Sequence, residues 1–321
     1  MNERTLRTLE YDKILEKAAA FAYSKNAKEA VKNIKPFSNA EDIKRALNET
    51  EEADIILFEH AINPSLNFDD VTQAIERAEI LSMLSMGELL RIERVLRVAR
   101  ALQGQILNVP DERIVLLKQK ASEIFTDKRL EDDIDKSIIS DTEMSDNAST
   151  NLKNIRGKMK KIAENIKSKL LNYVNGSAYS KYMQDNIITV RNDRYVVPLK
   201  SEYKGMIPGL IHDQSASGAT LYVEPMVIVE LNNDLKTCML EEAAEIDKIL
   251  RAFTVRVGNE AEAIKSTFEI ITDLDVIFAK AQYANATKSV KPVINKSGRI
   301  DIRKGRHPLI PAEKVVANDV R

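Results

Sequence analysis

The sequence has one cysteine, no tryptophan and only 5% aromatic residues among 321. The single thiol, Cys238, excludes a disulfide within the chain. Few aromatic residues combined with 30% charged residues argue against an all-β fold or a thick α/β core. The length is about twice that of a usual domain, so we expect one extended domain or two compact ones, built mainly from solvated helices.

Long apolar runs are also missing. No stretch approaches the roughly 18 apolar residues that span a bilayer, and the first thirty residues lack the apolar core of a signal peptide. We therefore expect a cytoplasmic protein with no membrane partner. Basic and acidic residues number 48 and 49, so only local charge can indicate a nucleic-acid partner.

Residues typical of metal and nucleotide chemistry are scarce. His60, His212 and His307 have no second histidine or cysteine at ligand spacing, and none of the ten glycines begins a GxxxxGK[ST] motif. The stretch GLIHDQSASGATLYVEP holds His, Asp and Ser, as a hydrolase would. Neighbouring side chains diverge in a strand, however, so we interpret SASG as a hairpin turn that uses Gly218. We assign no catalytic residue, metal or cofactor to this chain.

What the sequence does have is apolar residues at helical spacing. They recur at steps of three and four up to about residue 130, and two narrow stripes follow an acidic, polar stretch. The first stripe is Leu152, Ile155, Met159, Ile162, Ile166, Leu170 and Val174. The second is Ile228, Leu231, Leu235, Met239, Ala243, Ile246, Leu250, Phe253 and Val257. We expect two long antiparallel helices that pack along a coiled-coil-like seam.

Between these helices the period changes to that of strands. VRNDRYVVPLK and the glycine-containing stretch after it predict three or four short strands, with a turn at RND. The predicted fold is mainly α, with a small β-rich clamp inserted in a helical lever. We divide the chain into the first part of the lever (1–149), the rising helix and clamp (150–226), the returning helix and second part of the lever (227–296), and the opening of a further domain (297–321).

Local charge points to a partner. The segment from Asn151 to Lys204 contains twelve basic and four acidic residues. Its positive excess can neutralise phosphates. The residues that we expect to bind nucleic acid are Lys158, Lys161, Lys169, Lys181, Arg191, Arg194, Lys200 and Lys204. Four tyrosines interleave as stacking groups: Tyr173, Tyr179, Tyr182 and Tyr195. The alternative is that the lysines only solvate a helix face.

The order of these parts resembles the bacterial MutS family. VRNDRYVVPLKSEYKG and GLIHDQSASGATLYVEP resemble the clamp of its second paralogue, the branch that ends in a small Smr nuclease domain, and IDIRKGRHPLI resembles the entry to the family's ATPase domain. VVANDV resembles the loop that faces adenine, which implies nucleotide contacts by Val315, Val316, Ala317 and Asn318. No Phe-x-Glu mismatch-reading motif is present.

The resemblance implies the N-terminal part of a longer homodimeric protein that binds ATP and Mg and is an ATPase and endonuclease. It implies a polyanionic target, either collided ribosomes with their rRNA, in ribosome quality control, or branched or duplex DNA, in suppression of recombination. A different interpretation of the seams is a structural coiled-coil scaffold for dimerisation that binds no nucleic acid.

We predict that the purified 321-residue chain hydrolyses neither ATP nor DNA, because its sequence supplies no phosphate-binding loop and no metal-ligand set. Phosphate release and plasmid nicking should equal those of a mock purification. Turnover that co-elutes with the chain through two further columns would contradict this prediction.

Overall fold

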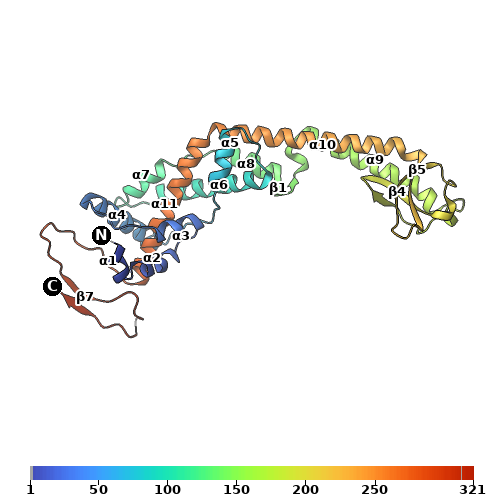
Figure 1. Cartoon of the computed structure of the whole chain (residues 1–321). Helices are drawn as coiled ribbons and strands as arrows, with labels where there is room; N and C mark the ends of the chain where they lie inside the picture. The colour runs from blue at the N-terminus through green and yellow to red at the C-terminus, as the bar shows by residue number, and fades with distance from the viewer. Residues whose placement is uncertain (1–2, 312) are drawn as a thin grey trace. The chain divides into compact units, whose positions relative to one another are not determined.

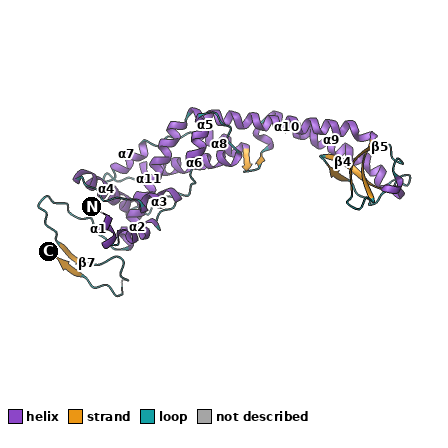
Figure 2. Ribbon diagram, viewed as in Figure 1, coloured by secondary structure: helices purple, strands orange, loops and turns teal. Residues whose placement is uncertain are grey.

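The computed structural model describes residues 3–311 and 313–321, which are mainly helical and carry small antiparallel sheets (Figure 2). Two compact units can be distinguished: the first comprises residues 1–135 and 253–321, and the second residues 136–252. The mainly α fold expected from the sequence is confirmed. The division of the chain at 149, 226 and 296 stays a prediction.

The first unit is built around α11 (Ala261–Ala286), which contacts six of the other helices, α2 to α7 (Figure 1). Its remaining helices are α1 (Glu3–Thr8), α2 (Tyr11–Ala19), α3 (Lys25–Lys32), α4 (Ala40–Asp54), α5 (Thr72–Glu79), α6 (Met86–Leu107), α7 (Leu116–Ser122) and α8 (Lys128–Ser137). A π-helical turn, η1 (Ile55–Glu59), follows α4, and β7 (Ile302–Gly305) pairs with β8 (Asn318–Val320).

Buried carboxylates in the first unit hold the beginnings of helices. Asp275 on α11 is fully buried and accepts hydrogen bonds from the backbone N–H groups of Tyr23 and Ser24, at 3.0 and 2.8 Å. Burial raises the pKa of Asp275 despite these bonds. Glu52 on α4 accepts in the same way from the first two N–H groups of α7, at 3.0 and 2.8 Å. Both acids therefore satisfy N–H groups that have no partner within a helix.

Two buried threonines do the same for loops. Thr267 on α11 accepts from the N–H of Phe125 at 2.9 Å. Thr254, near the end of α10 (Met226–Asn259), accepts from the N–H of Leu84 at 3.0 Å. The long helices thus carry polar groups at buried positions where loop backbone would otherwise lack a partner.

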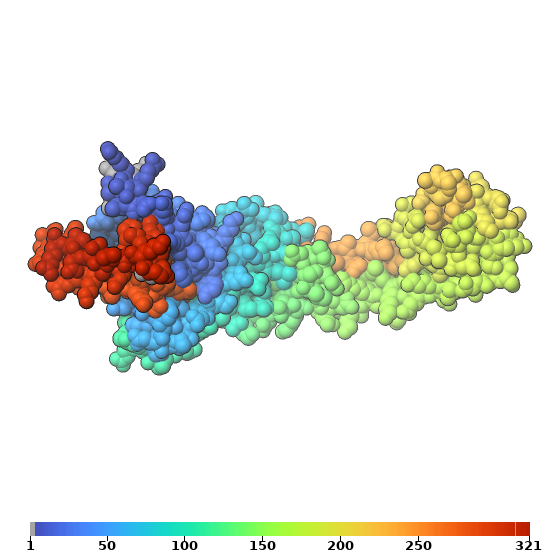
Figure 3. Space-filling model, turned by 90° about the horizontal axis from the view of Figure 1, so that it is seen from below, coloured from blue at the N-terminus to red at the C-terminus, as the bar shows by residue number. Residues whose placement is uncertain are grey.

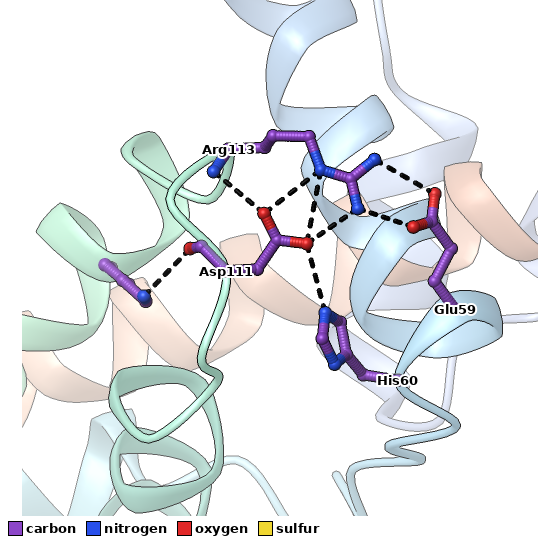
Figure 4. Close-up of polar contacts among 5 residues, drawn as sticks. Glu59, His60, Asp111 and Arg113 are labelled. Carbon is purple, nitrogen blue, oxygen red and sulfur yellow. Dashed lines mark hydrogen bonds and ion pairs between the residues drawn. The ribbon is translucent and has the colours of Figure 1, made fainter.

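A cluster of charged side chains ties η1 to the loop before α7 (Figure 4). Arg113 donates to Asp111 at 2.6 to 3.2 Å and to Glu59 at 2.5 and 3.3 Å, while His60 Nε2 lies 3.1 Å from Asp111 Oδ2. The Arg113 hydrogen bonds hold the pKa of Asp111 well below its usual range. Each carboxylate of the cluster thus has a basic partner, and the cluster links the π-helical turn to the loop.

The second unit contains two long helices, α9 (Thr150–Asn175) and the first part of α10. Ser149 at the start of α9 donates to Glu245 at 2.8 Å, whereas Val174 at its end shares a buried apolar cluster with Ile228. The helices therefore run antiparallel, as expected from the sequence. Shorter elements complete the unit: β1 (Ile138–Ser140), β2 (Glu143–Met144), η2 (Asp146–Ala148), η3 (Ser180–Tyr182) and η4 (Ser201–Tyr203).

Most residues of the two expected stripes are buried or half-buried in the structure. Ala243 is an exception, because it is exposed and polar contacts occupy this part of the seam. Glu242 pairs with Arg156 at 2.6 Å, and Glu245 is buried against the start of α9. Cys238, which the stripe pattern passes over, is fully buried on α10.

The inserted strands form one antiparallel sheet in the order β3-β4-β6-β5 (Figure 2). The strands are β3 (Thr189–Arg191), β4 (Arg194–Lys200), β5 (Gly209–Gln214) and β6 (Thr220–Pro225). One face packs on α9 and α10 through Val197, Leu199, Leu221 and Val223. The two edges of the sheet also approach each other: Asn192, in the turn after β3, donates to the carbonyl of His212 on β5 at 3.2 Å, and Arg191 on β3 lies 3.4 Å from the Asp213 carboxylate on β5. The sheet therefore curls towards closure.

Turn chemistry shapes both hairpins. Asn192 and Asp193 have φ of 49° and 60°, the left-handed pair required by a two-residue type I′ turn, as RND predicts. Gly218 has φ of 75° in the turn between β5 and β6. The Gly218 N–H donates to the Ser215 carbonyl at 2.8 Å. The interpretation of SASG as a turn with Gly218 at positive φ is confirmed.

We predict that Asp111→Asn lowers stability at neutral pH. A carboxylate with a depressed folded-state pKa stabilises the protein above its unfolded pKa of about 3.9, and this contribution is lost as pH falls through the folded-state pKa. The urea midpoints of variant and wild type should therefore differ most at about pH 7 and converge in acid. A difference between the urea midpoints that does not change with pH would contradict a stabilising role for the Asp111 charge.

We predict opposite effects for two glycine substitutions. Gly218→Ala should destabilise the chain by about 1 kcal/mol, because alanine pays a steric cost at positive φ. Gly157→Ala is the matched control: this glycine lies within α9, and beyond its chain neighbours and the nearby backbone of α9 no described atom lies within 4 Å of the place that a methyl group would take. That change should stabilise the chain by up to about 1 kcal/mol. Urea unfolding followed by circular dichroism measures both; equal signs would refute the turn argument.

Candidate nucleic-acid interface

The basic residues of the second unit fall into three groups. Lys158, Lys161 and Lys169 lie on α9, with the first two exposed and the third half-buried. Steps of three and eight positions bring them to one side of the helix. Within the described part of the chain they form no ion pair or hydrogen bond. Their ammonium groups are therefore available to a partner.

The second group comes together from three short segments. Lys200 at the end of β4 donates to the carbonyl of Lys181 at 3.5 Å, and the Lys181 ammonium lies 4.9 Å from the centre of the Tyr182 ring. Tyr182 in turn packs on Tyr203 with 5.0 Å between ring centres, and Lys204 follows Tyr203 in the chain. We call Lys181, Lys200 and Lys204 the lysine cluster.

The third group, Arg191 and Arg194, is already engaged. Arg191 lies 3.4 Å from the Asp213 carboxylate and 4.2 Å from the centre of the Tyr222 ring. Arg194 donates to Glu224 at 2.8 and 3.1 Å and, through its other terminal nitrogen, to the α10 side chain Asn233 at 2.6 Å. These arginines bind acids of their own sheet, unlike the lysines.

The four tyrosines are likewise occupied within the unit. Tyr173 and Tyr179 stack on each other at 4.8 Å, and all four pack against the apolar cluster between the sheet and the helices. Lys167 covers the ring of Tyr195 at 5.9 Å. Their rings therefore stabilise the clamp, and base stacking by them stays a prediction.

His212 and Ser215 have different partners. His212 Nε2 bonds to Glu224, and a β-bulge at this histidine interrupts the pairing of β5 with β6. Ser215 Oγ accepts from the N–H of Thr220 at 3.0 Å. The histidine and serine that a hydrolase would use therefore stabilise the β5–β6 hairpin. Charge counting along the sequence missed Glu224, whose only signal was a lone acid between Val223 and Pro225 in an apolar strand.

Other candidate sites are less informative. Among residues 3–311 and 313–321 no group of His, Cys, Asp and Glu could hold a metal ion. In the first unit an open cavity of about 810 Å³ lies between α2 and the segment around His307. The N-terminal residues, in blue, and the C-terminal segment, in red, lie side by side there (Figure 3). Its lysines are engaged, because Lys13 pairs with Glu10 and Lys17 donates to the carbonyl of Pro308 at 3.1 Å.

The expected adenine-facing loop lies in the first unit, leading into β8. The Val315 N–H donates to the Pro311 carbonyl at 3.0 Å, Val316 is exposed, and Ala317 is half-buried. Asn318 begins β8 and is exposed. These residues could line a base but offer no charged group for phosphates, so the nucleotide contact stays a prediction.

The helices within residues 3–311 and 313–321 are too short or too polar to span a bilayer.

Comparison with known proteins gives a consistent result. No family model matches the chain. It is 43% identical over 319 residues to a protein named Endonuclease MutS2 from Alkaliphilus oremlandii, an alignment that covers 99% of this chain and 40% of that protein. Proteins of the same name from Clostridium perfringens and Clostridium botulinum are 42% and 40% identical over 100% of the chain and 41% of their own length. The chain thus spans about two fifths of the length of these relatives. Along its whole length the chain is similar to proteins named Endonuclease MutS2.

Proposed function

We propose that this chain is the lever and clamp part of a MutS2-type protein and that it binds the phosphate backbone of a nucleic acid through the second unit. The observation that carries the proposal is a set of lysines that have no acidic partner among residues 3–311 and 313–321. It consists of Lys158, Lys161 and Lys169 on α9 and of the lysine cluster at the sheet. Bound phosphates would release counterions from the nucleic acid, which supplies affinity without reading sequence.

Five acids of the second unit support the same surface, because each is engaged with a neighbouring side chain. Glu242 and Glu245 on α10 are engaged with the start of α9, and Glu224, Asp213 and Asp193 are paired with basic side chains. These five acids are therefore satisfied by neighbouring side chains, whereas the lysines of the set have no acidic partner in the part of the chain that the structure describes. The positive potential should be strongest where α9 and the lysine cluster present their ammonium groups.

The target is a polyanion, either branched or duplex DNA or the rRNA of collided ribosomes. Both present the phosphates that lysines recognise. We propose that ATP and Mg binding, endonuclease activity and homodimer formation belong to the complete cytoplasmic protein, and we derive no step of that chemistry from this chain. A structural coiled-coil scaffold is the alternative, because α9 and α10 pack along a seam.

We predict that alanine at Lys161, Lys169, Lys200 and Lys204 weakens binding to a fluorescein-labelled duplex DNA by about tenfold or more. The slope of log K against log salt should become shallower by up to about 0.9 for each phosphate that the variant no longer binds. Fluorescence anisotropy at several salt concentrations measures both quantities.

The matched control removes four exposed lysines of the first unit, Lys25, Lys35, Lys265 and Lys296, and should leave the slope unchanged. Equal slopes for wild type and the second-unit variant would exclude this surface. No salt-dependent binding by the wild type would favour the scaffold. Competition between collided ribosomes and branched DNA for the complete protein distinguishes the two targets.

A further inference from the structure

Glu224 is the most completely enclosed charged residue of the clamp sheet. It lies on β6 with 0% of its surface exposed. Its Oε1 accepts from Arg194 at 2.8 Å and from the Asn232 amide at 2.7 Å, and its Oε2 accepts from Arg194 at 3.1 Å and bonds to His212 Nε2. Every partner donates, so the carboxylate is fully satisfied.

The partners of Glu224 come from three other elements. Arg194 begins β4, His212 lies at the bulge of β5, and Asn232 is fully buried on α10. Asn232 also pairs with the backbone of Tyr195, accepting from its N–H at 3.1 Å and donating to its carbonyl at 3.0 Å. One carboxylate therefore fixes three strands and a helix relative to one another.

The contacts around Glu224 are stable only while its carboxylate stays paired. A buried carboxylate costs several kcal/mol of desolvation unless it is paired and hydrogen-bonded. Arg194 cannot turn outward to a phosphate without leaving Glu224 short of its main charge partner. Arg194 therefore has a structural task, although it lies in the basic segment.

We propose that Glu224 is a positioning residue for nucleic-acid binding. It holds β4 and β5 on α10 and so fixes the lysine cluster, which includes Lys200 at the far end of β4, relative to the lysines of α9. This inference rests on the proposed function. Binding several phosphates at once requires both lysine groups to keep their spacing, as in any preorganised site.

The sign of the effect separates positioning from simple charge. Glu224→Gln removes one negative charge from a basic surface, so electrostatics alone predicts tighter binding. Loss of positioning predicts weaker binding. We expect the Kd of the 321-residue chain for the labelled duplex to rise by about threefold or more.

Two companion variants complete the test. Glu202→Gln removes an exposed acid that lies between Ser201 and Tyr203 beside the lysine cluster, and it should leave binding unchanged or tighten it. Asn232→Ala removes the α10 donor to Glu224 and changes no charge. It should weaken binding in the same direction as Glu224→Gln, because it loosens the same junction.

The outcomes are distinct. Tighter or unchanged binding by Glu224→Gln overturns the inference but leaves the proposed function, which the lysine variant tests. Unchanged binding by Asn232→Ala also overturns the inference. If Glu224→Gln does not fold by circular dichroism, Asn232→Ala decides. No binding by the wild-type chain overturns both proposals.

Discussion

Buried backbone N–H groups must find acceptors, and in this protein side chains on a few helices provide many of them. Asp275 and Thr267 do so from α11, Glu52 from α4 and Asn232 from α10. Each lies at a position that faces the interior, where an apolar residue would pack but could not bond. The loops between elements therefore take their shape from the helices that they touch. The apolar stripes form the packing faces of the helices, and these polar residues fix the loops that contact those faces.

Local rules made the helices and hairpins predictable from sequence. The period of three and four residues identified the two antiparallel helices, and the positive φ angles of Asn192 and Gly218 follow from residues that tolerate them. Contacts between side chains that lie far apart in the sequence were not predictable in the same way. The alternation of TLYVEP would send Glu224 to solvent, because Val223 faces the helices. The curled sheet covers that second face instead, with Arg191 over Tyr222.

Counting charges along the chain also mixes two kinds of residue. Arginine offers a planar fork of donors that suits carboxylates, and both arginines of the predicted set bind carboxylates of the sheet. Lysine is a compact, strongly hydrated charge on a flexible stem. The six lysines of the set form no such pair with any residue that the structure describes. A surface whose available charges are all lysines suits attachment to a backbone of any sequence, since ammonium groups bind phosphates as point charges.

The buried Cys238 gives the chain an internal reporter. It is the only thiol in the sequence and has no exposed surface, so a thiol reagent can reach it only when the surroundings of α10 open. The labelling rate in native conditions then measures the free energy of that local opening, as amide exchange does for a backbone group. A cysteine engineered at the surface would react with a fluorescent label far faster than Cys238 does. Selective labelling is therefore possible without removing the natural thiol. Bound polyanion that braces the second unit would slow the reaction of Cys238 without touching it.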